Sequence, residues 1–256
     1  MIPEETGDGL LVLVASYNEE LNLKKTLPSL LRFVNPEDIL VIDDGSSDNT
    51  LGVATQFGVN TMRNPRNLGR NRAVVRGFGW GIKRGYSQFV CVDADGQHPA
   101  TDLPRIRRFL RNNPGVDCLI MSRFIHLNNL GSVPLADAFG IIVSSFLVSA
   151  GCGQYISDPT TGYIAFSANA ANCLIKHVET LAHIVSDNTW AMGQYPLFSK
   201  CGFRITELPS RYIPRASGPR KMFTPLKRFK YPFWLLRAFL AVRVTLHDII
   251  CLDKGG

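Results

Sequence analysis

Short apolar runs alternate with segments of helical pattern along roughly the first 125 residues of this 256-residue chain. Continuous apolar runs of five to eight residues are typical of strands that a parallel sheet buries on both faces. The alternation therefore predicts a doubly wound, Rossmann-like α/β domain with helices on both faces of a mostly parallel sheet. Strands are expected over 9–16, 38–43, near Val59, over 88–93 and 117–122, and helices over 18–33 with Asn18 as cap, after 48, and over 67–85 and 102–112.

The second half of the chain repeats the alternation less regularly. A turn-rich loop at 158–162 separates an apolar, helical segment from a short strand. No GxGxxG motif follows the first expected strand, so dinucleotide binding of the usual kind is not predicted. Helices are expected over 134–151 and 168–177, a strand over 163–166, an edge strand over 203–212 and an apolar segment over 232–252.

Charge is distributed unevenly along the chain, which has a net charge of +7. From Lys200 to the end, twelve Lys and Arg residues stand against three acids, so this part carries +9. Such asymmetry predicts an anionic partner for the C-terminal part: nucleic acid, an anionic membrane surface or a phosphate substrate. The six cysteines show no CxxC spacing, and the N-terminus lacks a signal-peptide pattern, which together predict reduced thiols in the cytoplasm.

The strand expected at 88–93 ends in an acid, and a second acid follows in the next loop. Asp93 and Asp95 are two positions apart, so their carboxylates converge at the carboxyl end of the sheet, where open α/β sheets bind ligands. Hard oxygen ligands suit Mg²⁺ or Mn²⁺, and such a cation neutralises a diphosphate. The alternative interpretation is a turn that carries two solvated acids.

A second acidic pair, Asp43 and Asp44, follows the strand expected at 38–43. Taken alone, the sequence of this loop is that of an ordinary Asp-Gly turn. Its place beside the first acidic pair instead suggests a division of labour at the same sheet edge. One pair would serve a base or ribose, which carry hydrogen-bond donors, and the other a metal-bound diphosphate.

Six motifs in this order resemble those of inverting family 2 glycosyltransferases, which have the GT-A fold. Within that family the resemblance is greatest to dolichyl- and polyprenyl-phosphate mannosyltransferases, and it extends from about residue 10 to 221. Each motif alone is weak, whereas the ordered set is specific. The motifs are SYNEE at 16–20, VIDDGSSD at 41–48, NLGR at 67–70, VDADGQHP at 92–99, SDPTTGY at 157–163 and RASGPRK at 215–221.

The resemblance implies a role for each matching residue, with Mg²⁺ or Mn²⁺ as cofactor and a GDP- or UDP-sugar as donor. It also implies a GT-A catalytic domain over 1–222, with a nucleotide-binding half over about 9–125 and an acceptor half over about 126–222. Residues 223–256 then form a C-terminal helical segment. Ala15, Tyr17 and Glu19 would line the base pocket, Asp44 would bond the base, Arg70 would lie near the diphosphate, Asp93, Asp95 and Gln97 would hold the cation, and Arg123, Arg215 and Lys221 would bind phosphate.

The acceptor is less well defined than the donor. A lipid phosphate, which the resemblance favours, is already an anionic nucleophile, whereas a hydroxyl acceptor needs a carboxylate to take its proton. Asp158 is the candidate base, or else it positions a loop or ligand. Four departures from the family pattern concern Ala15 in place of Pro, the lack of Lys and Arg over 127–146, a missing acid near Gly193-Gln194, and Arg220-Lys221 in place of Ser-Lys.

The apolar segment at 232–252 has the length of a membrane span, but Arg237, Arg243 and Asp248 interrupt it. A helix lying in the membrane interface suits this pattern, and so does a core helix with a solvated basic face. With the basic residues that precede the segment, the first interpretation predicts a peripheral protein at the cytoplasmic face of a membrane.

Two other functions compete with sugar transfer. The run from Asp93 to Gly96 also resembles the Asp-x-Asp-Gly of haloacid-dehalogenase-type phosphohydrolases, although it comes late in the chain and no second acidic pair follows. A basic, non-enzymatic module for nucleic acid is compatible with the C-terminal charge but has no recognised motif. His98 is interpreted either as a ligand of the metal or leaving group, or as a loop residue with an ordinary hydrogen bond.

Overall fold

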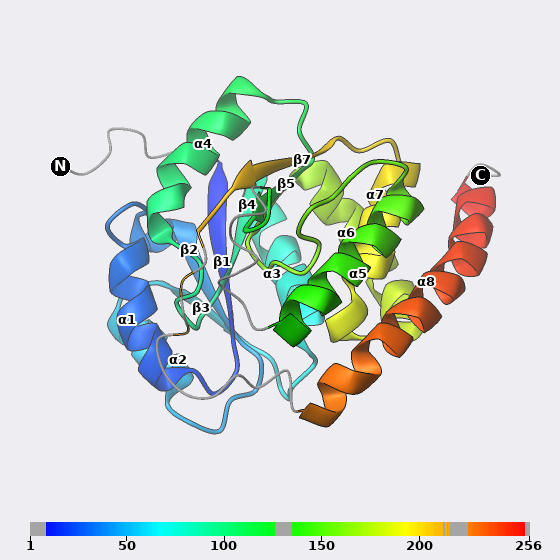
Figure 1. The fold of residues 1–256 in the computed structure, drawn as a ribbon. Helices are drawn as coiled ribbons and strands as arrows, with labels where there is room; N and C mark the ends of the chain where they lie inside the picture. Colours follow the sequence, from blue (N-terminus) through cyan, green and yellow to red (C-terminus); the bar gives the residue numbers. More distant parts are fainter. Residues whose placement is uncertain (1–8, 126–134, 212, 214, 216–224, 254–256) are drawn as a thin grey trace.

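A seven-stranded sheet forms the centre of the protein, whose computed structural model describes residues 9–125, 135–211, 213, 215 and 225–253 (Figure 1). The strand order is β3-β2-β1-β4-β6-β5-β7. β6 runs antiparallel to both of its neighbours, and the other pairs are parallel. The strands are β1 (Leu10–Ser16), β2 (Ile39–Asp43), β3 (Asn60–Arg63), β4 (Gln88–Asp93), β5 (Cys118–Ser122), β6 (Ile164–Ser167) and β7 (Ile205–Pro209).

Helices cover both faces of the sheet, as the apolar runs predict. Alternate residues of β1 pack into two separate cores, because Leu11 and Leu13 face one side and Val12 and Val14 the other. The helices are α1 (Glu20–Leu30), α2 (Thr50–Gln56), α3 (Arg70–Ile82), α4 (Leu103–Asn112), α5 (Leu135–Cys152), α6 (Ala168–Ile184), α7 (Ala191–Lys200) and α8 (Pro225–Asp253), with short 3₁₀ turns η1 (Pro36–Asp38), η2 (Ala100–Asp102) and η4 (Asp187–Thr189).

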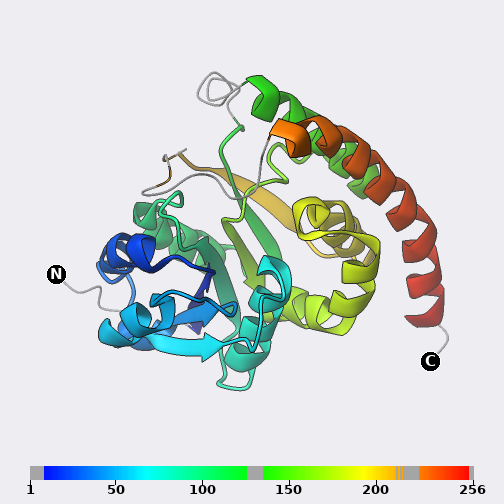
Figure 2. The same cartoon turned by 90° about the horizontal axis from the view of Figure 1, so that it is seen from below.

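The helices are arranged in unequal layers. α1, α2 and α4 cover the face of Val12 and Val14, and α3, α6 and α7 cover the opposite face. On this second side α5 packs against α7, and α8 packs against α5 and α7, so that both helices form an outer layer (Figure 2). Among the described residues, no helix is both long enough and apolar enough to span a bilayer.

The fold class and the strand–helix alternation predicted from sequence are confirmed, and β7 is an edge strand as expected. The glycines that weaken the pattern of α3 have a packing role. A Cβ at Gly77 would lie 2.5 Å from Ile42 Cδ1, and one at Gly81 would lie 2.6 Å from Phe89 Cε1. The helix therefore approaches the sheet more closely than a residue with a side chain would allow.

Three details of the prediction are wrong. Asn18 does not cap α1: it has a left-handed φ of 53°, and its Oδ1 accepts a hydrogen bond from Ser47 N at 2.8 Å, so the helix begins at Glu20 with Glu19 as N-cap. α6 continues to Ile184, beyond the expected end at 177. α7 is not predicted, because residues 192–198 are all buried and carry no amphipathic period.

Lys221 and the stretch 126–134 lie outside the described residues.

Candidate active site

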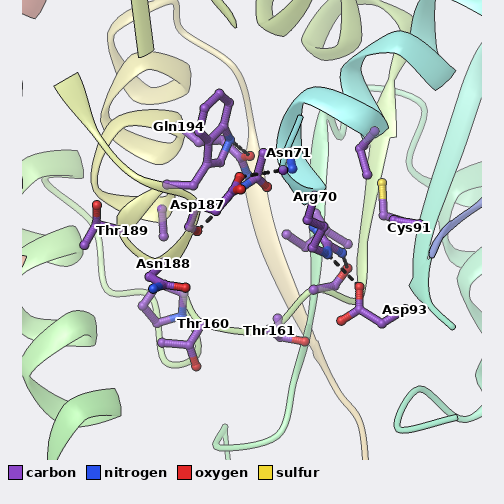
Figure 3. A pocket seen from close by; sticks show the side chains of 18 of the residues that line it. Arg70, Asn71, Cys91, Asp93, Thr160, Thr161, Asp187, Asn188, Thr189 and Gln194 are labelled. Carbon is purple, nitrogen blue, oxygen red and sulfur yellow. Dashed lines mark hydrogen bonds and ion pairs between the residues drawn. The ribbon is translucent and has the colours of Figure 1, made fainter. Parts of the chain in front are cut away.

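Strand register brings the predicted acidic motifs to one edge of the sheet. Ser16 pairs with Asp43 and Ala15 pairs with Asp93, so β1, β2 and β4 end at the same level. Beside these strand ends lies a cavity of about 770 Å³ (Figure 3). Of the described candidate residues, all but Asp158 line it: Ala15, Tyr17, Glu19, Asp44, Arg70, Asp93, Asp95, Gln97, Arg123 and Arg215.

Asp44 organises the loop that leads into α3. Its Oδ1 accepts hydrogen bonds from Asn64 Nδ2 at 2.7 Å and Leu68 N at 2.9 Å, and its Oδ2 accepts one from Gly69 N at 2.9 Å. Gly45 next to it has a φ of 76° and approaches the Arg66 backbone so closely that a Cβ would lie 2.7 Å from Arg66 C. Asp44 thus borders the cavity with both oxygens bound to its own loop, and its contact with a base stays a prediction.

Asp93 forms a partly buried ion pair with Arg70. Arg70 Nε donates to Asp93 Oδ1 at 2.6 Å, and Arg70 Nη2 donates to Gly162 O at 2.9 Å. Burial works to raise the pKa of Asp93, but Arg70 and the other cations nearby hold it below its usual range. A Cβ at Gly162 would lie 2.6 Å from Arg70 Nη2, so the glycine of the SDPTTGY motif makes room for this pair.

His98 supports the loop beneath Asp93. Its Nδ1 accepts a hydrogen bond from Asp93 N at 3.0 Å, and its ring stacks on Tyr163 with centroids 4.8 Å apart. Burial lowers the pKa of His98 to about 4, so the imidazole is neutral near pH 7. With one ring nitrogen bound to the backbone and one face covered, His98 matches the interpretation as a loop residue.

Arg215 lies between two predicted binding carboxylates. Its Nη2 donates to Glu19 Oε1 at 2.6 Å and to Oε2 at 2.7 Å, and its Nη1 donates to Asp95 Oδ2 at 3.0 Å. Asp95 Oδ1 accepts from Gln97 N at 3.1 Å. Burial, and then the negative charge of Asp93, raise the pKa of Asp95. One guanidinium therefore offsets two acids from distant motifs.

Asp158 lies behind the cavity wall and is fully buried. Arg123 binds it through two nitrogens, with Nε 2.7 Å from Oδ2 and Nη2 2.9 Å from Oδ1. Thr160 Oγ1 donates to Oδ1 at 2.9 Å, and Glu207 accepts from the backbone N of Ser157 at 3.0 Å. Of its two predicted roles, this geometry favours positioning over proton abstraction, because Asp158 orients Arg123 toward the cavity.

The cavity has two chemically different ends. The charged end is formed by Tyr17, Glu19, Asp93, Asp95, Gln97 and the arginines that pair with them. The apolar end extends between α5, α8 and the residues after η4. It is formed by Phe139, Ile141, Trp190, Tyr231 and Leu235.

Sequence reasoning missed the wall that faces α3. Asp187 Oδ1 accepts from Asn71 Nδ2 at 2.7 Å and from Asn71 N at 3.2 Å, and so supplies an acid to the N-terminus of α3 (Figure 3). Trp190 Nε1 donates to Gln194 Oε1 at 3.0 Å, at the place where the family pattern has an acid. No local signal marks the contact between Asn71 and Asp187, because these residues are 116 positions apart.

The residues predicted to hold a cation have suitable donor atoms. Asp93, Asp95 and Gln97 all border the cavity and offer carboxylate and amide oxygens, the donors that Mg²⁺ and Mn²⁺ prefer. Within the described ranges, no group of three histidine, cysteine or acidic side chains is placed to hold a metal ion. The oxygen set fits a cation, and Arg215 Nη1 binds one of these oxygens, Asp95 Oδ2, at 3.0 Å.

Comparison with known proteins identifies the family. The profile of Glycosyl transferase family 2 matches residues 11–174. The chain belongs to this family. The undecaprenyl-phosphate mannosyltransferase of Micrococcus luteus is 29% identical over 220 residues, covering 83% of this chain and 87% of that protein. The polyprenol monophosphomannose synthase of Mycolicibacterium smegmatis is 29% identical over 245 residues, covering 90% of this chain and 88% of that protein.

The fold agrees with the family. Glucosyl-3-phosphoglycerate synthase from Mycobacterium tuberculosis, solved with Mn²⁺, uridine diphosphate and phosphoglyceric acid, superposes with a TM-score of 0.59 at 17% identity. The match covers 91% of this chain and 78% of that one, and at this identity it bears on the fold. The resemblance to polyprenyl-phosphate mannosyltransferases and the assignment as a glycosyltransferase are confirmed, and they exclude the phosphohydrolase and the non-enzymatic module.

Proposed function

We propose that this enzyme transfers a hexose, with mannose favoured, from a nucleotide-diphospho-sugar to a polyprenyl phosphate, with inversion and with a divalent cation. The observation that carries the proposal is the two-ended cavity. Its charged end suits a metal-bound diphosphate, and its apolar end suits the first units of an isoprenoid chain. Arg123 lines the same cavity and is held by Asp158. The names of the two mannosyltransferase relatives support the same acceptor class.

The charged end would hold the donor. Tyr17 is 40% exposed and, with Ala15, offers a surface for the base beside Asp44. Asp93, Asp95 and Gln97 would hold the cation. When bound, the cation offsets the charge that develops on the departing diphosphate. Mn²⁺ in the structural neighbour supports a divalent ion but leaves Mg²⁺ equally suitable.

Transfer to a lipid phosphate needs no general base. A phosphate oxygen attacks the anomeric carbon from the face opposite the diphosphate, the bond from that carbon to the diphosphate oxygen breaks, and the nucleoside diphosphate departs. Arg123 is the described cation best placed for the incoming phosphate, because Asp158 fixes its guanidinium by two hydrogen bonds. Asp158 is therefore a positioning residue in this proposal.

A transfer assay tests the proposal directly. The enzyme is incubated with Mn²⁺, a short-chain prenyl phosphate in solution, and GDP-mannose, UDP-glucose or UDP-N-acetylglucosamine in turn. We expect a prenyl phosphomannose from GDP-mannose, with inverted configuration by NMR and no product in EDTA. The assignment of the acceptor would be contradicted if the enzyme bound and turned over the donors but formed no sugar-linked prenyl phosphate from any of them.

A hydroxyl acceptor is the second candidate, and one observation favours it. Asp187 is exposed, borders the cavity and carries a carboxylate that can take a proton. The variant Asp187→Asn separates the two functions. If the acceptor is a phosphate, the pH profile of turnover keeps its shape in this variant. If it is a hydroxyl and Asp187 is its base, the acidic limb disappears and turnover falls by roughly a hundredfold or more.

A further inference from the structure

The outer layer of the protein exposes an unusual number of large apolar side chains. On α5, Phe139 is 59% exposed and Phe146 is 72% exposed, with Ile142 between them at the same helical face. On α8, Phe233 is 68% exposed and Val244 is 70% exposed. We call this surface the α5–α8 face; it consists of Phe139, Ile142, Phe146, Phe233, Leu236, Leu240 and Val244.

Both helices are apolar on the side that they bury and again on this outer side. The inner side of α8 places Tyr231, Leu235, Ala238 and Val242 in the core. An ordinary surface helix is apolar on its buried side and polar on the opposite side, so a second apolar side indicates contact with a partner or with lipid. Seven large apolar side chains on two adjacent helices exceed the scattered exposure of an ordinary surface, so this face indicates an interaction site.

The charge of the face selects the kind of partner. Arg237 and Arg243 are exposed on α8, and the described side chains of α5 and α8 (138–152 and 231–245) include no acid. The guanidinium of Arg243 lies 5.7 Å from the ring of Phe239. Apolar side chains flanked by arginines complement an anionic lipid surface. Two copies of the chain packed face to face would instead oppose these arginines with no acid among the described side chains of either helix (138–152 and 231–245).

The face also continues into the cavity. Phe139 belongs both to the α5–α8 face and to the apolar end, and Tyr231 and Leu235 line the cavity from the same helix that carries Phe233 and Leu236. Figures 1 and 2 both show α5 and α8 lying side by side at the outside of the molecule. A molecule held by this face would therefore have direct access to the apolar end.

We propose that the α5–α8 face docks on the surface of a bilayer that contains anionic lipids, with both helices lying in the interface and the apolar end of the cavity open to the membrane. This inference rests on the proposed function for its meaning, since an acceptor with an isoprenoid chain resides in a bilayer. The contact itself is a physical property that does not depend on catalysis.

Vesicle flotation tests the contact. Vesicles of phosphatidylcholine with phosphatidylglycerol are mixed with the full chain, with the double variant Phe146→Ser/Leu240→Ser, or with the control Leu21→Ser. Phe146 and Leu240 do not line the cavity, and Leu21 is 63% exposed on α1, away from the face. We expect the double variant to lose vesicle binding by about tenfold or more, because two large apolar contacts are removed. The control should bind like the unmodified chain.

The arginines supply a second measurement. Arg237→Gln/Arg243→Gln should weaken binding to vesicles with phosphatidylglycerol and reduce its salt dependence, and should leave binding to purely zwitterionic vesicles nearly unchanged. Circular dichroism and GDP-mannose binding confirm that each variant is folded. Equal vesicle binding by the double variant and the unmodified chain would overturn the proposal. The proposal would also be overturned if the unmodified chain formed a stable dimer in solution and the double variant were a monomer.

Transfer assays separate this inference from the proposed function. The double variant should use a short-chain prenyl phosphate in solution at the normal rate, and should lose transfer to undecaprenyl phosphate embedded in vesicles. If vesicles bind but neither acceptor is used, the proposed function fails and the docking face stands. If both acceptors are used equally by the double variant, the docking face fails and the proposed function stands.

Discussion

At the charged end of the cavity, carboxylates and guanidinium groups meet in pairs, whereas the apolar end is lined by rings and aliphatic chains from α5, α8 and the segment after η4. The charged end is built on the ends of β1 and β4, which the sheet holds in register. The apolar end is built on helices of the outer layer, which pack on each other and on α7 rather than on the sheet. This contrast suggests that the charged end sets the chemistry, and that the apolar end selects the acceptor.

The largest effect should come from the charged end. Asp95→Asn should lower transfer by about a thousandfold and weaken Mn²⁺ binding, because it removes one of two carboxylates offered to the cation. Calorimetric titration with Mn²⁺ and GDP gives the affinity, and EDTA should reduce the unmodified enzyme to a similar rate.

Asp38→Asn is the matched control for this change. Asp38 immediately precedes β2, at the opposite end of the strand from the cavity, where it accepts a hydrogen bond from Tyr86. This variant should retain full activity. Normal Mn²⁺ affinity in Asp95→Asn would remove Asp95 from the metal set.

The pair of Arg123 and Asp158 forms part of the cavity wall: Arg123 lines the cavity, and Asp158 is buried behind it. Asp158→Ala should lower the free energy of unfolding by about 3 kcal/mol, since it leaves a partly buried guanidinium without its carboxylate. Urea denaturation measures this loss. Glu179→Ala breaks the exposed ion pair with Arg72, whose atoms are 2.9 Å apart, and should cost less than about 1 kcal/mol.

The same variants decide the role of Asp158. If Asp158 is a positioning residue, Asp158→Ala should raise the KM for prenyl phosphate without changing the shape of the pH profile. If Asp158→Ala kept its stability and lost the acidic limb of the profile, Asp158 would be the base and the acceptor a hydroxyl.

The sequence predicts the parts of this site whose contacts are local along the chain, and it misses contacts between distant residues. The charged end is predictable, because acids at the ends of parallel strands meet at one edge and the motifs occur within short runs. The contact between Arg215 and Glu19 joins residues 196 positions apart and has no local pattern. α7 is hidden for a different reason: it is buried all round, so its sequence has no period.

Glycines show the same limit within a helix. The low helix propensity of glycine weakens the prediction of α3 at Gly77 and Gly81. Close packing of the helix on β1, β2 and β4 is nevertheless what requires these two glycines. The apolar end was predictable as a hydrophobic segment but not as a cavity wall, because its shape depends on how α5 and α8 pack.

Arg215 provides a test within the charged end itself. Because its guanidinium pairs with both Glu19 and Asp95, it competes with a cation for Asp95. Arg215→Gln should therefore bind Mn²⁺ with GDP up to about tenfold more tightly, while transfer becomes slower. Arg84→Gln, which alters an arginine stacked on Trp80, is the control and should change neither. Weaker binding in Arg215→Gln would show instead that Arg215 contacts the nucleotide directly.

The smallest effect should come from the apolar end, and it should be confined to the acceptor. Phe139→Ala shortens a cavity-lining side chain, so it should raise the KM for a soluble short-chain prenyl phosphate by about fivefold, the equivalent of roughly 1 kcal/mol of lost apolar contact. The KM for GDP-mannose should stay unchanged. Ile142→Ala removes a neighbouring side chain of the α5–α8 face that does not line this cavity, and should leave both constants unaltered. A parallel rise in both constants after Phe139→Ala would mean that the two ends of the cavity do not act separately, because the acceptor wall would then also hold the donor.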